Sequence, residues 1–430
     1  MKTKKLMMVA ACFVLAGWSG GAQNVFDTYF EKKSLRVDFA LSGNMEFQAA
    51  ALIRMREEPV WGGPVHNLID TSCYGGYYVK VFDKASGELI FSRGFNTLFE
   101  EWRATEQAEK EVQSWANSVS VPFPRREVTF ELSGRNRADM LFSTMLKVDI
   151  EPSVMFIDRG RLRDNKVTRI QYAGEPSGKV DLVFLAEGYT EAGQDKFVAD
   201  ARRFTEALFA TPPFDSRRDD FNVWSVGLVS EEEGTDIPGR GVFRNTALNS
   251  GFYTFGMDRY LTTQDMTPVR DAVWNVPCDA IFILVNSDMY GGGGMYNFYA
   301  MGTADNERTA SVFVHELGHS FAGLADEYFS SEVAYDTGFY PDGLEPWEPN
   351  ISTLVNFSLK WEDMLPAGTP VPTPPEETYV GETGVFEGGG YRARGVYRPR
   401  VHCMMRDYAA FCPVCSRAIV RMIDSVSDKR

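Results

Sequence analysis

Histidine is scarce in this chain, which has only four in 430 residues. Beyond the N-terminal segment there is no run of the ~18 apolar residues that a transmembrane helix needs. Basic residues are also too few to balance the acidic ones, 44 against 59, which gives a formal net charge of −15. Because such a surface repels phosphate backbones, we exclude nucleic acid as a partner. No internal repeat stands out, nor does any serine or cysteine nucleophile constellation.

The first 22 residues have the layout of a secretory signal peptide. MKTKKLMMVAACFVLAGWSGGAQ begins with three lysines, continues through an apolar core, and reaches Gly20-Gly21-Ala22. This pattern predicts cleavage after Ala22 and an exported protein, secreted, periplasmic or on the cell surface. A lipoprotein cleavage box ending at Cys12 is the alternative. The apolar run that continues past Cys12 argues against it.

The cysteines that remain after residue 22 are odd in number. They are Cys73, Cys278, Cys403, Cys412 and Cys415. In an exported protein, the Cys412-Pro-Val-Cys415 spacing favours a structural disulfide over a redox or zinc pair, and Cys403 could pair with either member. The spacing alone leaves the connectivity open.

The chain changes character near residue 160. Residues 25–150 contain strand-like runs, among them a hairpin around Lys84–Gly87, and a helical stretch near 99–118. After residue 165 buried strands alternate with a helix: KVDLVFLAEGYT, the helical 191–211, FNVWSVGLVS and CDAIFILVN. We therefore predict an α+β protein of two domains. A β-sandwich-like N-terminal domain (23–160) precedes an α/β catalytic domain (161–430).

A metal motif lies in VHELGHSFAGLADEY, residues 314–328. His315 and His319 are four positions apart, so a helix presents both imidazoles on one face, as a Zn²⁺ site requires. Glu316 projects about 100° round the helix from His315, where it could act as a base on a metal-activated water. The alternative is a buried structural helix whose histidines form hydrogen bonds and bind no metal. It has to explain two of four histidines and a glutamate on one apolar helix.

A catalytic zinc needs a third protein ligand. Gly323 is a natural helix stop, and Asp326 follows it by three residues, where the returning chain could bring a carboxylate under the metal. We prefer Asp326, with Glu327 and the distant His402 as the alternatives.

HELGHSFAGLADEY is similar to the IgA-peptidase family of secreted bacterial zinc metallopeptidases, which are metzincin-like. VDLVFLAEGYT, NVWSV, GTDIPG and YRPRVHCMMRDYAAFCPVC resemble the same family in order, so the match covers about 165–425. The β-rich region resembles the family's N-terminal domain. One departure is that Gly323 comes four residues after His319, whereas metzincins usually have three. The resemblance implies a metzincin-like fold with a methionine turn, for which Met405 is the candidate and Met404 the alternative.

Three further segments bear on the site. Tyr408 or Arg406 could donate a hydrogen bond to an oxyanion. The glycine-rich segment 290–303 predicts an edge strand over Met295–Met301, and the resemblance implies that a substrate peptide pairs with this rim. The acidic segment 230–241, with Glu231, Glu232, Glu233 and Asp236, is a candidate Ca²⁺ site, although such runs are more often solvated loops.

Together these patterns predict a monomeric zinc endopeptidase that hydrolyses protein or glycoprotein substrates. In this interpretation, Zn²⁺ on His315, His319 and Asp326 activates water, and Glu316 is the general base. The competing hypotheses are a zinc amidase or deacetylase acting on glycans, and a non-catalytic binding or adhesion protein built on a peptidase fold.

Overall fold

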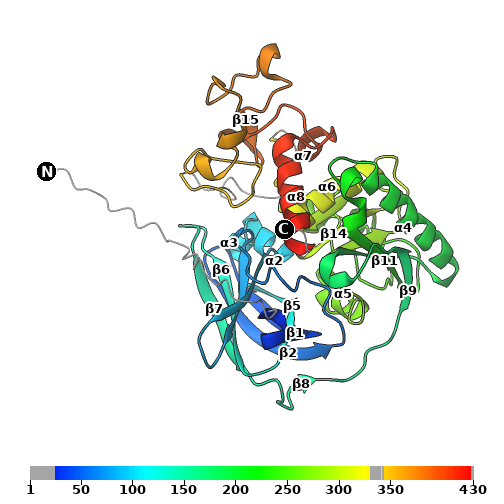
Figure 1. Ribbon diagram of the computed structural model, residues 1–430. Helices are drawn as coiled ribbons and strands as arrows, with labels where there is room; N and C mark the ends of the chain where they lie inside the picture. Colours follow the sequence, from blue (N-terminus) through cyan, green and yellow to red (C-terminus); the bar gives the residue numbers. More distant parts are fainter. Residues whose placement is uncertain (1–24, 330–339, 341–342, 428–430) are drawn as a thin grey trace.

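The computed structural model describes residues 25–329, 340 and 343–427 (Figure 1). The predicted signal peptide and Cys12 lie outside the described residues. None of the helices in the described residues is long and apolar enough to cross a membrane.

The N-terminal part consists of two four-stranded sheets that face each other. One has the order β5-β1-β2-β8 and the other β4-β3-β6-β7, and every pairing except β2 with β8 is antiparallel. One hydrophobic cluster joins both sheets, with Val37 and Phe39 on β1 and Val79 on β3 fully buried. The elements are α1 (Val25–Tyr29), β1 (Phe30–Gly43), β2 (Gln48–Glu58), β3 (Tyr77–Asp83), β4 (Leu89–Phe95), α2 (Leu98–Trp102), α3 (Glu106–Lys110), β5 (Gln113–Pro124), β6 (Val128–Arg135), β7 (Phe142–Ile150) and β8 (Ile157–Asp158).

The second part is built around a six-stranded mixed sheet of order β13-β14-β12-β10-β11-β9. The four inner strands are parallel, whereas β13 and β9 run antiparallel at the edges. Every residue of β10 and β12 is buried, as expected of strands covered on both faces. The strands are β9 (Lys166–Gln171), β10 (Val180–Glu187), β11 (Phe221–Gly227), β12 (Ala280–Val285), β13 (Gly292–Met295) and β14 (Tyr299–Thr303).

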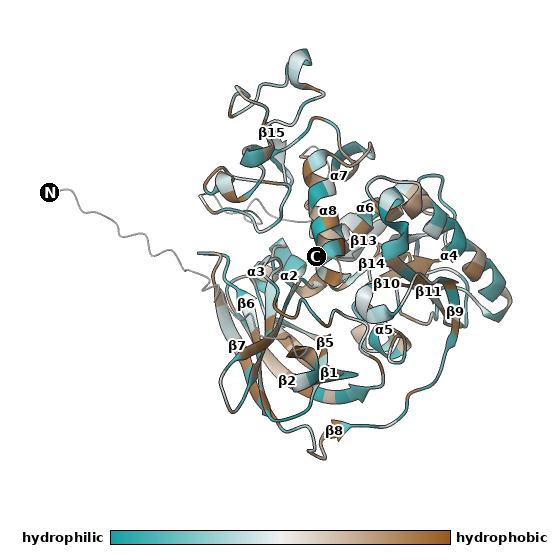
Figure 2. Ribbon diagram, in the orientation of Figure 1, coloured by the Kyte–Doolittle hydropathy of each residue, from teal (hydrophilic) through white to brown (hydrophobic). Residues whose placement is uncertain are grey.

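Helices surround this sheet, and a small C-terminal lobe lies beside them (Figure 1). The helices are α4 (Gln194–Phe209), α5 (Met266–Ala272), α6 (Thr309–Ala322), α7 (Met404–Asp407) and α8 (Pro413–Val426), and the lobe holds the hairpin of β15 (Phe386–Gly389) and β16 (Arg392–Arg398). In Figure 2, α8 carries both hydrophilic and hydrophobic residues along its length. This agrees with its buried face, which includes Val414, Ile419 and Ile423.

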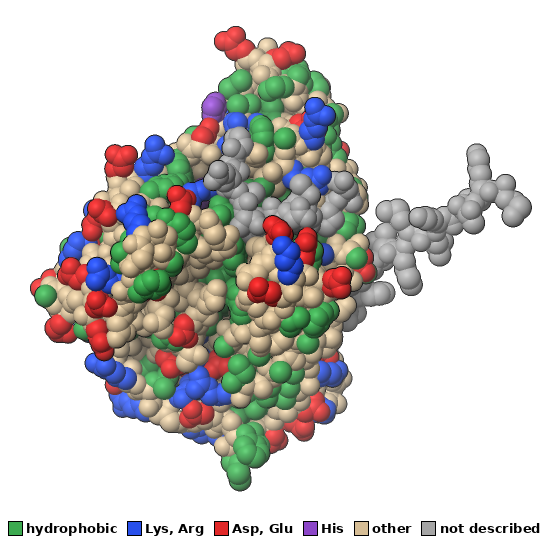
Figure 3. All heavy atoms as spheres, turned by 180° about the vertical axis from the view of Figure 1, so that it is seen from behind, with side chains coloured by type: hydrophobic (Ala, Val, Ile, Leu, Met, Phe, Trp, Pro, Cys, Tyr) green, Lys and Arg blue, Asp and Glu red, His purple; other side chains and the backbone are tan. Residues whose placement is uncertain are grey.

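The two parts are joined by specific contacts. Arg36 in β1 forms an ion pair with Asp271 in α5 at 2.6 Å, and the backbone N–H of Asn96 donates to the carbonyl of Tyr296 at 2.7 Å. Figure 3 shows acidic and basic side chains interspersed over one face of the molecule, with a hydrophobic projection at its lower end.

Three local predictions are wrong. The helical stretch expected over 99–118 ends at Lys110, because residues from Gln113 pair with β1 as strand β5. The strand expected over Met295–Met301 is a hairpin, since Asn297 takes a positive φ of 50° in the turn between β13 and β14. The predicted Cys412–Cys415 disulfide is absent, because Cys403, Cys412 and Cys415 are not joined by a disulfide in the structure.

Candidate metal centre

The two motif histidines lie in the last turns of α6. This helix ends at Gly323, which adopts a left-handed φ of 65° and donates its N–H to the carbonyl of His319. That bond, from the left-handed glycine to a carbonyl four residues earlier, is the αL type of helix end, and the following N–H, of Leu324, donates to the carbonyl of Gly318 at 3.2 Å. The chain therefore reverses under the helix, and residues 324–326 pass next to the histidines.

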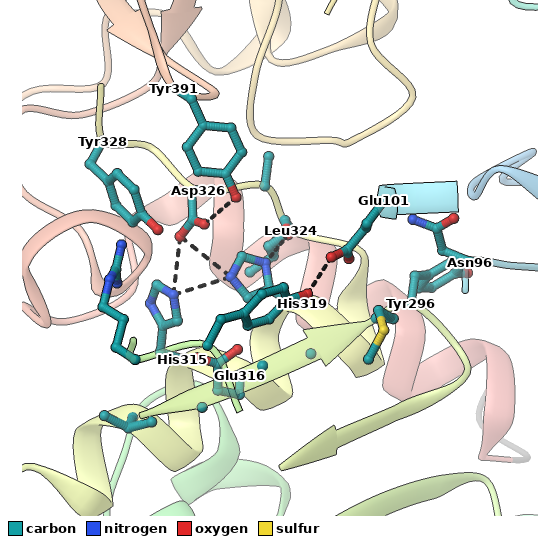
Figure 4. Close-up of a pocket in the computed structure, with 18 of the residues that line it drawn as sticks. Asn96, Glu101, Tyr296, His315, Glu316, His319, Leu324, Asp326, Tyr328 and Tyr391 are labelled. Atoms are coloured by element: carbon teal, nitrogen blue, oxygen red, sulfur yellow. Dashed lines mark hydrogen bonds and ion pairs between the residues drawn. The ribbon is translucent and has the colours of Figure 1, made fainter. Parts of the chain in front are cut away.

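Three side-chain atoms converge beside this helix end (Figure 4). His315 Nε2 lies 3.1 Å from Asp326 Oδ1, His319 Nε2 lies 3.4 Å from the same oxygen, and the two Nε2 atoms are 3.1 Å apart. In a tetrahedral zinc site with bonds of ~2.0–2.1 Å, two ligand atoms stand ~3.3–3.4 Å apart. The three atoms thus match one face of such a tetrahedron.

Neighbouring groups fix which atoms face the centre. Nδ1 of His315 donates to the carbonyl of Met404 at 2.9 Å, and Nδ1 of His319 donates to that of Leu324 at 2.5 Å. Each neutral imidazole then turns the lone pair of Nε2 toward Asp326. Asp326 Oδ2 accepts a hydrogen bond from the Tyr391 hydroxyl at 2.6 Å, whereas its buried Oδ1 has no hydrogen-bond partner.

The two Nε2 lone pairs and the Asp326 carboxylate oxygen repel each other unless a positive charge lies between them. Without a metal, a proton takes that place. Burial opposes the imidazolium, but Asp326 and Glu316 outweigh it and raise the pKa of His319 to about 9. Burial likewise opposes ionisation of Asp326, yet the two histidines hold its pKa well below the usual range. A divalent metal ion would meet the same demand more completely.

The two rival third ligands are placed elsewhere. Glu327 is buried on the other side of the chain, where its Oε1 accepts hydrogen bonds from Asn350 and from the Cys415 thiol. His402 is largely exposed and pairs with Asp407. Among the three candidates, the structure brings only Asp326 to His315 and His319.

Glu316 lies beside the histidines and faces β13. Burial raises the pKa of its carboxyl, although both histidines oppose that shift. The glycine-rich segment permits this approach, because a Cβ on Gly292 would lie 2.8 Å from Glu316 Oε1 and one on Gly294 would lie 2.5 Å from the Glu316 carbonyl oxygen. Strand β13 can therefore lie against α6 only where it lacks side chains.

The outer edge of β13 is partly occupied by the chain itself. The N–H of Leu261 donates to the carbonyl of Gly292 at 3.3 Å, and Tyr260 forms a parallel bridge with the same glycine. At Gly292, therefore, the strand edge at which the resemblance implies substrate pairing is already paired with residues 260–261 of the chain itself.

The methionines predicted to form a turn lie directly under α6. Met405 is fully buried, and a Cβ on Gly318 would lie 2.9 Å from its sulfur. Tyr408 reaches the pocket, with its ring 5.4 Å from that of His315 and its hydroxyl 2.6 Å from that of Tyr290. Arg406 instead donates to the carbonyl of Val401, and it does not line the pocket.

The pocket that holds these groups has a volume of about 130 Å³. Asn96 and Glu101 of the N-terminal part contribute to its wall, and Glu101 accepts a hydrogen bond from the Tyr260 hydroxyl. Tyr391, Tyr290 and the N-terminal residues were missed in the sequence, because a lone tyrosine or glutamate far from the motif carries no spacing signal.

The candidate calcium loop is held by its own hydrogen bonds. Glu232 accepts from the backbone N–H of Asn245 at 2.7 Å and pairs with Arg244, and Asp236 accepts from the N–H of Arg244 at 2.6 Å. These contacts hold Glu232 and Asp236 against residues 244–245, and the Ca²⁺ site stays a prediction.

Comparison with protein-family models gives two matches. The model described as IgA Peptidase M64 matches residues 168–380 and 375–423, and the model described as Peptidase M64 N-terminus matches residues 25–145. No curated protein matches the chain. The peptidase match contains most of the α/β part with the candidate metal centre, and the N-terminal match contains most of the two paired sheets, although β7 runs past its end and β8 lies beyond it.

Proposed function

The chain belongs to the IgA peptidase M64 family, with a peptidase domain that follows the family's N-terminal domain, and on this basis we propose that it is a secreted zinc endopeptidase. The observation that carries the choice of metal chemistry is the convergence of His315 Nε2, His319 Nε2 and Asp326 Oδ1 within 3.4 Å of one another. Nitrogen and carboxylate oxygen donors in this number suit a catalytic Zn²⁺ with one open position.

In this proposal His315, His319 and Asp326 hold the metal. When bound, Zn²⁺ would polarise the scissile carbonyl and lower the pKa of a water molecule. Glu316 takes the proton of the attacking water and delivers it to the leaving amine. Its raised pKa suits the first step, because a more basic carboxylate accepts the proton more readily.

The Tyr408 hydroxyl is the group best situated to donate to the developing oxyanion. It lines the pocket beside His315, and its partner there is another hydroxyl, that of Tyr290, which can turn to accept or donate. Arg406, the alternative from the sequence, is engaged by the Val401 carbonyl.

We further propose that residues 1–22 are removed on export, that residues 23–160 form the accompanying domain and 161–430 the catalytic domain, and that the enzyme acts as a monomer on protein or glycoprotein substrates. N-terminal sequencing of the exported protein tests the cleavage site, with Gln23 expected at the mature end.

Replacement of Glu316 by glutamine tests the catalytic proposal. The purified Glu316→Gln variant should retain its zinc and lose about 10²–10⁴-fold in turnover of a proteome-derived peptide library, because an amide cannot accept the water's proton. Glu307→Gln, an exposed glutamate just before α6, is the matched control and should keep normal activity. Near-normal cleavage by a zinc-loaded Glu316→Gln protein would refute the assignment of Glu316 as the general base.

A further inference from the structure

A second cluster of metal-binding side chains lies in the protein interior, apart from the histidines. The thiols of Cys403, Cys412 and Cys415 and the carboxylate of Glu327 offer four ligand atoms that all lie within 4.8 Å of one another. All four residues are buried, and none of the thiols is in a disulfide. The proposed catalysis uses none of them.

The distances within this cluster fit metal coordination better than a disulfide. Cys403 Sγ lies 3.7 Å from Cys415 Sγ, and Cys415 Sγ lies 3.1 Å from Glu327 Oε1. With Zn–S bonds of ~2.3 Å, two sulfurs of a tetrahedral site stand ~3.8 Å apart, and a disulfide needs ~2.05 Å.

The N-terminus of α8 favours negative charge on the sulfur of Cys412. Cys412 is the N-cap of α8, whose 14 residues direct their N-terminal N–H groups and the positive end of the helix dipole toward the cluster. The N–H of Cys415 donates to Cys412 Sγ and that of Cys412 to Cys403 Sγ, each at 3.4 Å.

A second, independent observation points to a missing partner. Glu327 is fully buried, and its Oε2 has no hydrogen-bond partner. An unsatisfied carboxylate oxygen in the interior is costly unless it meets a proton or a cation. Beside three thiols, a cation would satisfy all four groups at once.

We propose that Cys403, Cys412, Cys415 and Glu327 bind a second, structural Zn²⁺ ion. Three sulfur ligands exclude Mg²⁺ and Ca²⁺, which require oxygen, and four protein ligands leave no position open for water. Binding displaces the thiol protons into solvent and involves no oxidant.

The site would hold together the segments that orient the catalytic centre. Glu327 directly follows Asp326, and its N–H donates to the carbonyl of Met405 at 2.8 Å. Cys403 directly precedes Met404, whose carbonyl accepts from His315 Nδ1. A metal in the cluster therefore ties the Asp326 segment and the Met404 turn to α8.

Metal analysis of the full-length mature protein tests this proposal. The wild type should hold two zinc ions per chain, and a His315→Ala/His319→Ala variant should keep one. A Cys412→Ser/Cys415→Ser variant should lose one. Cys73→Ser, which changes an exposed cysteine outside the cluster, should keep two.

Cobalt gives a readout that does not depend on the cysteine variant folding. Loading the metal-free protein with Co²⁺ should produce an intense thiolate-to-cobalt absorption band in the wild type and in the His315→Ala/His319→Ala variant. Two histidines and an aspartate cannot produce that band.

A histidine variant with no bound metal and no thiolate band would overturn the proposal. So would an intact mass two hydrogens lower, with a disulfide mapped within the cluster. The proposed peptidase activity is a separate matter, since a protein that binds two zinc ions but cleaves nothing would refute that activity alone.

Discussion

Removal of the Tyr391 hydroxyl should weaken metal binding at the proposed catalytic site without changing any of the three proposed ligands. This hydroxyl donates to Asp326 Oδ2 at 2.6 Å, and Asp326 Oδ1 faces the two histidines. The hydrogen bond holds the carboxylate in one orientation, and both partners lie in a site where Asp326 is only 5% exposed. Phenylalanine in place of Tyr391 removes the donor and preserves the ring.

The size of the effect follows from the charge on the acceptor. A hydrogen bond to a buried charged group contributes about 1.5–3 kcal/mol, which corresponds to roughly 10–100-fold in an equilibrium constant. In the metal-free protein Asp326 also carries its charge, opposite a protonated His319, so part of the loss cancels. We therefore expect metal affinity to fall about tenfold, the lower end of the range for such supporting groups.

Recovery of activity measures this affinity at the catalytic site alone. Metal-depleted enzyme is titrated with buffered free Zn²⁺, and the midpoint of the peptidase activity should shift about tenfold for Tyr391→Phe, with near-normal activity at saturation. Tyr408→Phe is the matched control. Its hydroxyl contacts that of Tyr290 and no ligand, so turnover should fall at an unchanged midpoint. A Tyr391→Phe midpoint equal to that of the wild type would refute the argument.

Two other changes probe packing and pH. Gly294→Ala should destabilise the protein by about 1–3 kcal/mol in urea unfolding, because its Cβ would lie 2.5 Å from a backbone oxygen of α6. Gly381→Ala, which has open space, should stay within about 0.5 kcal/mol of the wild type, and an equal loss in both would contradict the steric argument. Burial outweighs the attraction of Arg36 and raises the pKa of the Glu58 carboxyl from 4.5 to about 7. Between these pH values the folded protein therefore holds a proton on Glu58 that the unfolded chain has lost. The free energy of unfolding should fall by about 3 kcal/mol as the pH rises from 4.5 to 7. Unfolding of Glu58→Gln at the same pH values should lack this component, and parallel pH profiles would disprove it.

Much of the centre could be predicted from local spacing. Helical periodicity placed His315 and His319 on one face, and Gly323 marked the helix end from which the chain returns with Asp326. The apolar runs that predicted β10 and β12 were also reliable, because a strand buried on both faces has a continuous hydrophobic sequence.

The groups that support the centre could not be predicted from the sequence. Backbone carbonyls, such as that of Met404, have no side-chain signature, and Tyr391 lies 65 residues from the aspartate it contacts. The Cys412–Cys415 spacing predicted a disulfide because spacing cannot reveal that Cys403 and Glu327 converge on the same point. The positions of these groups depend on tertiary contacts, which local sequence patterns do not encode.

The hydrogen bond between His315 and Met404 also bears on the order in which the protein is made. Its partners lie 89 residues apart, so the histidines leave the ribosome well before the carbonyl that orients one of them. A nascent or truncated chain that ends before Met404 contains His315, His319 and Asp326 but lacks this support for His315. Proteolytic competence should therefore arise late in synthesis, after both the paired sheets and the central sheet have been translated.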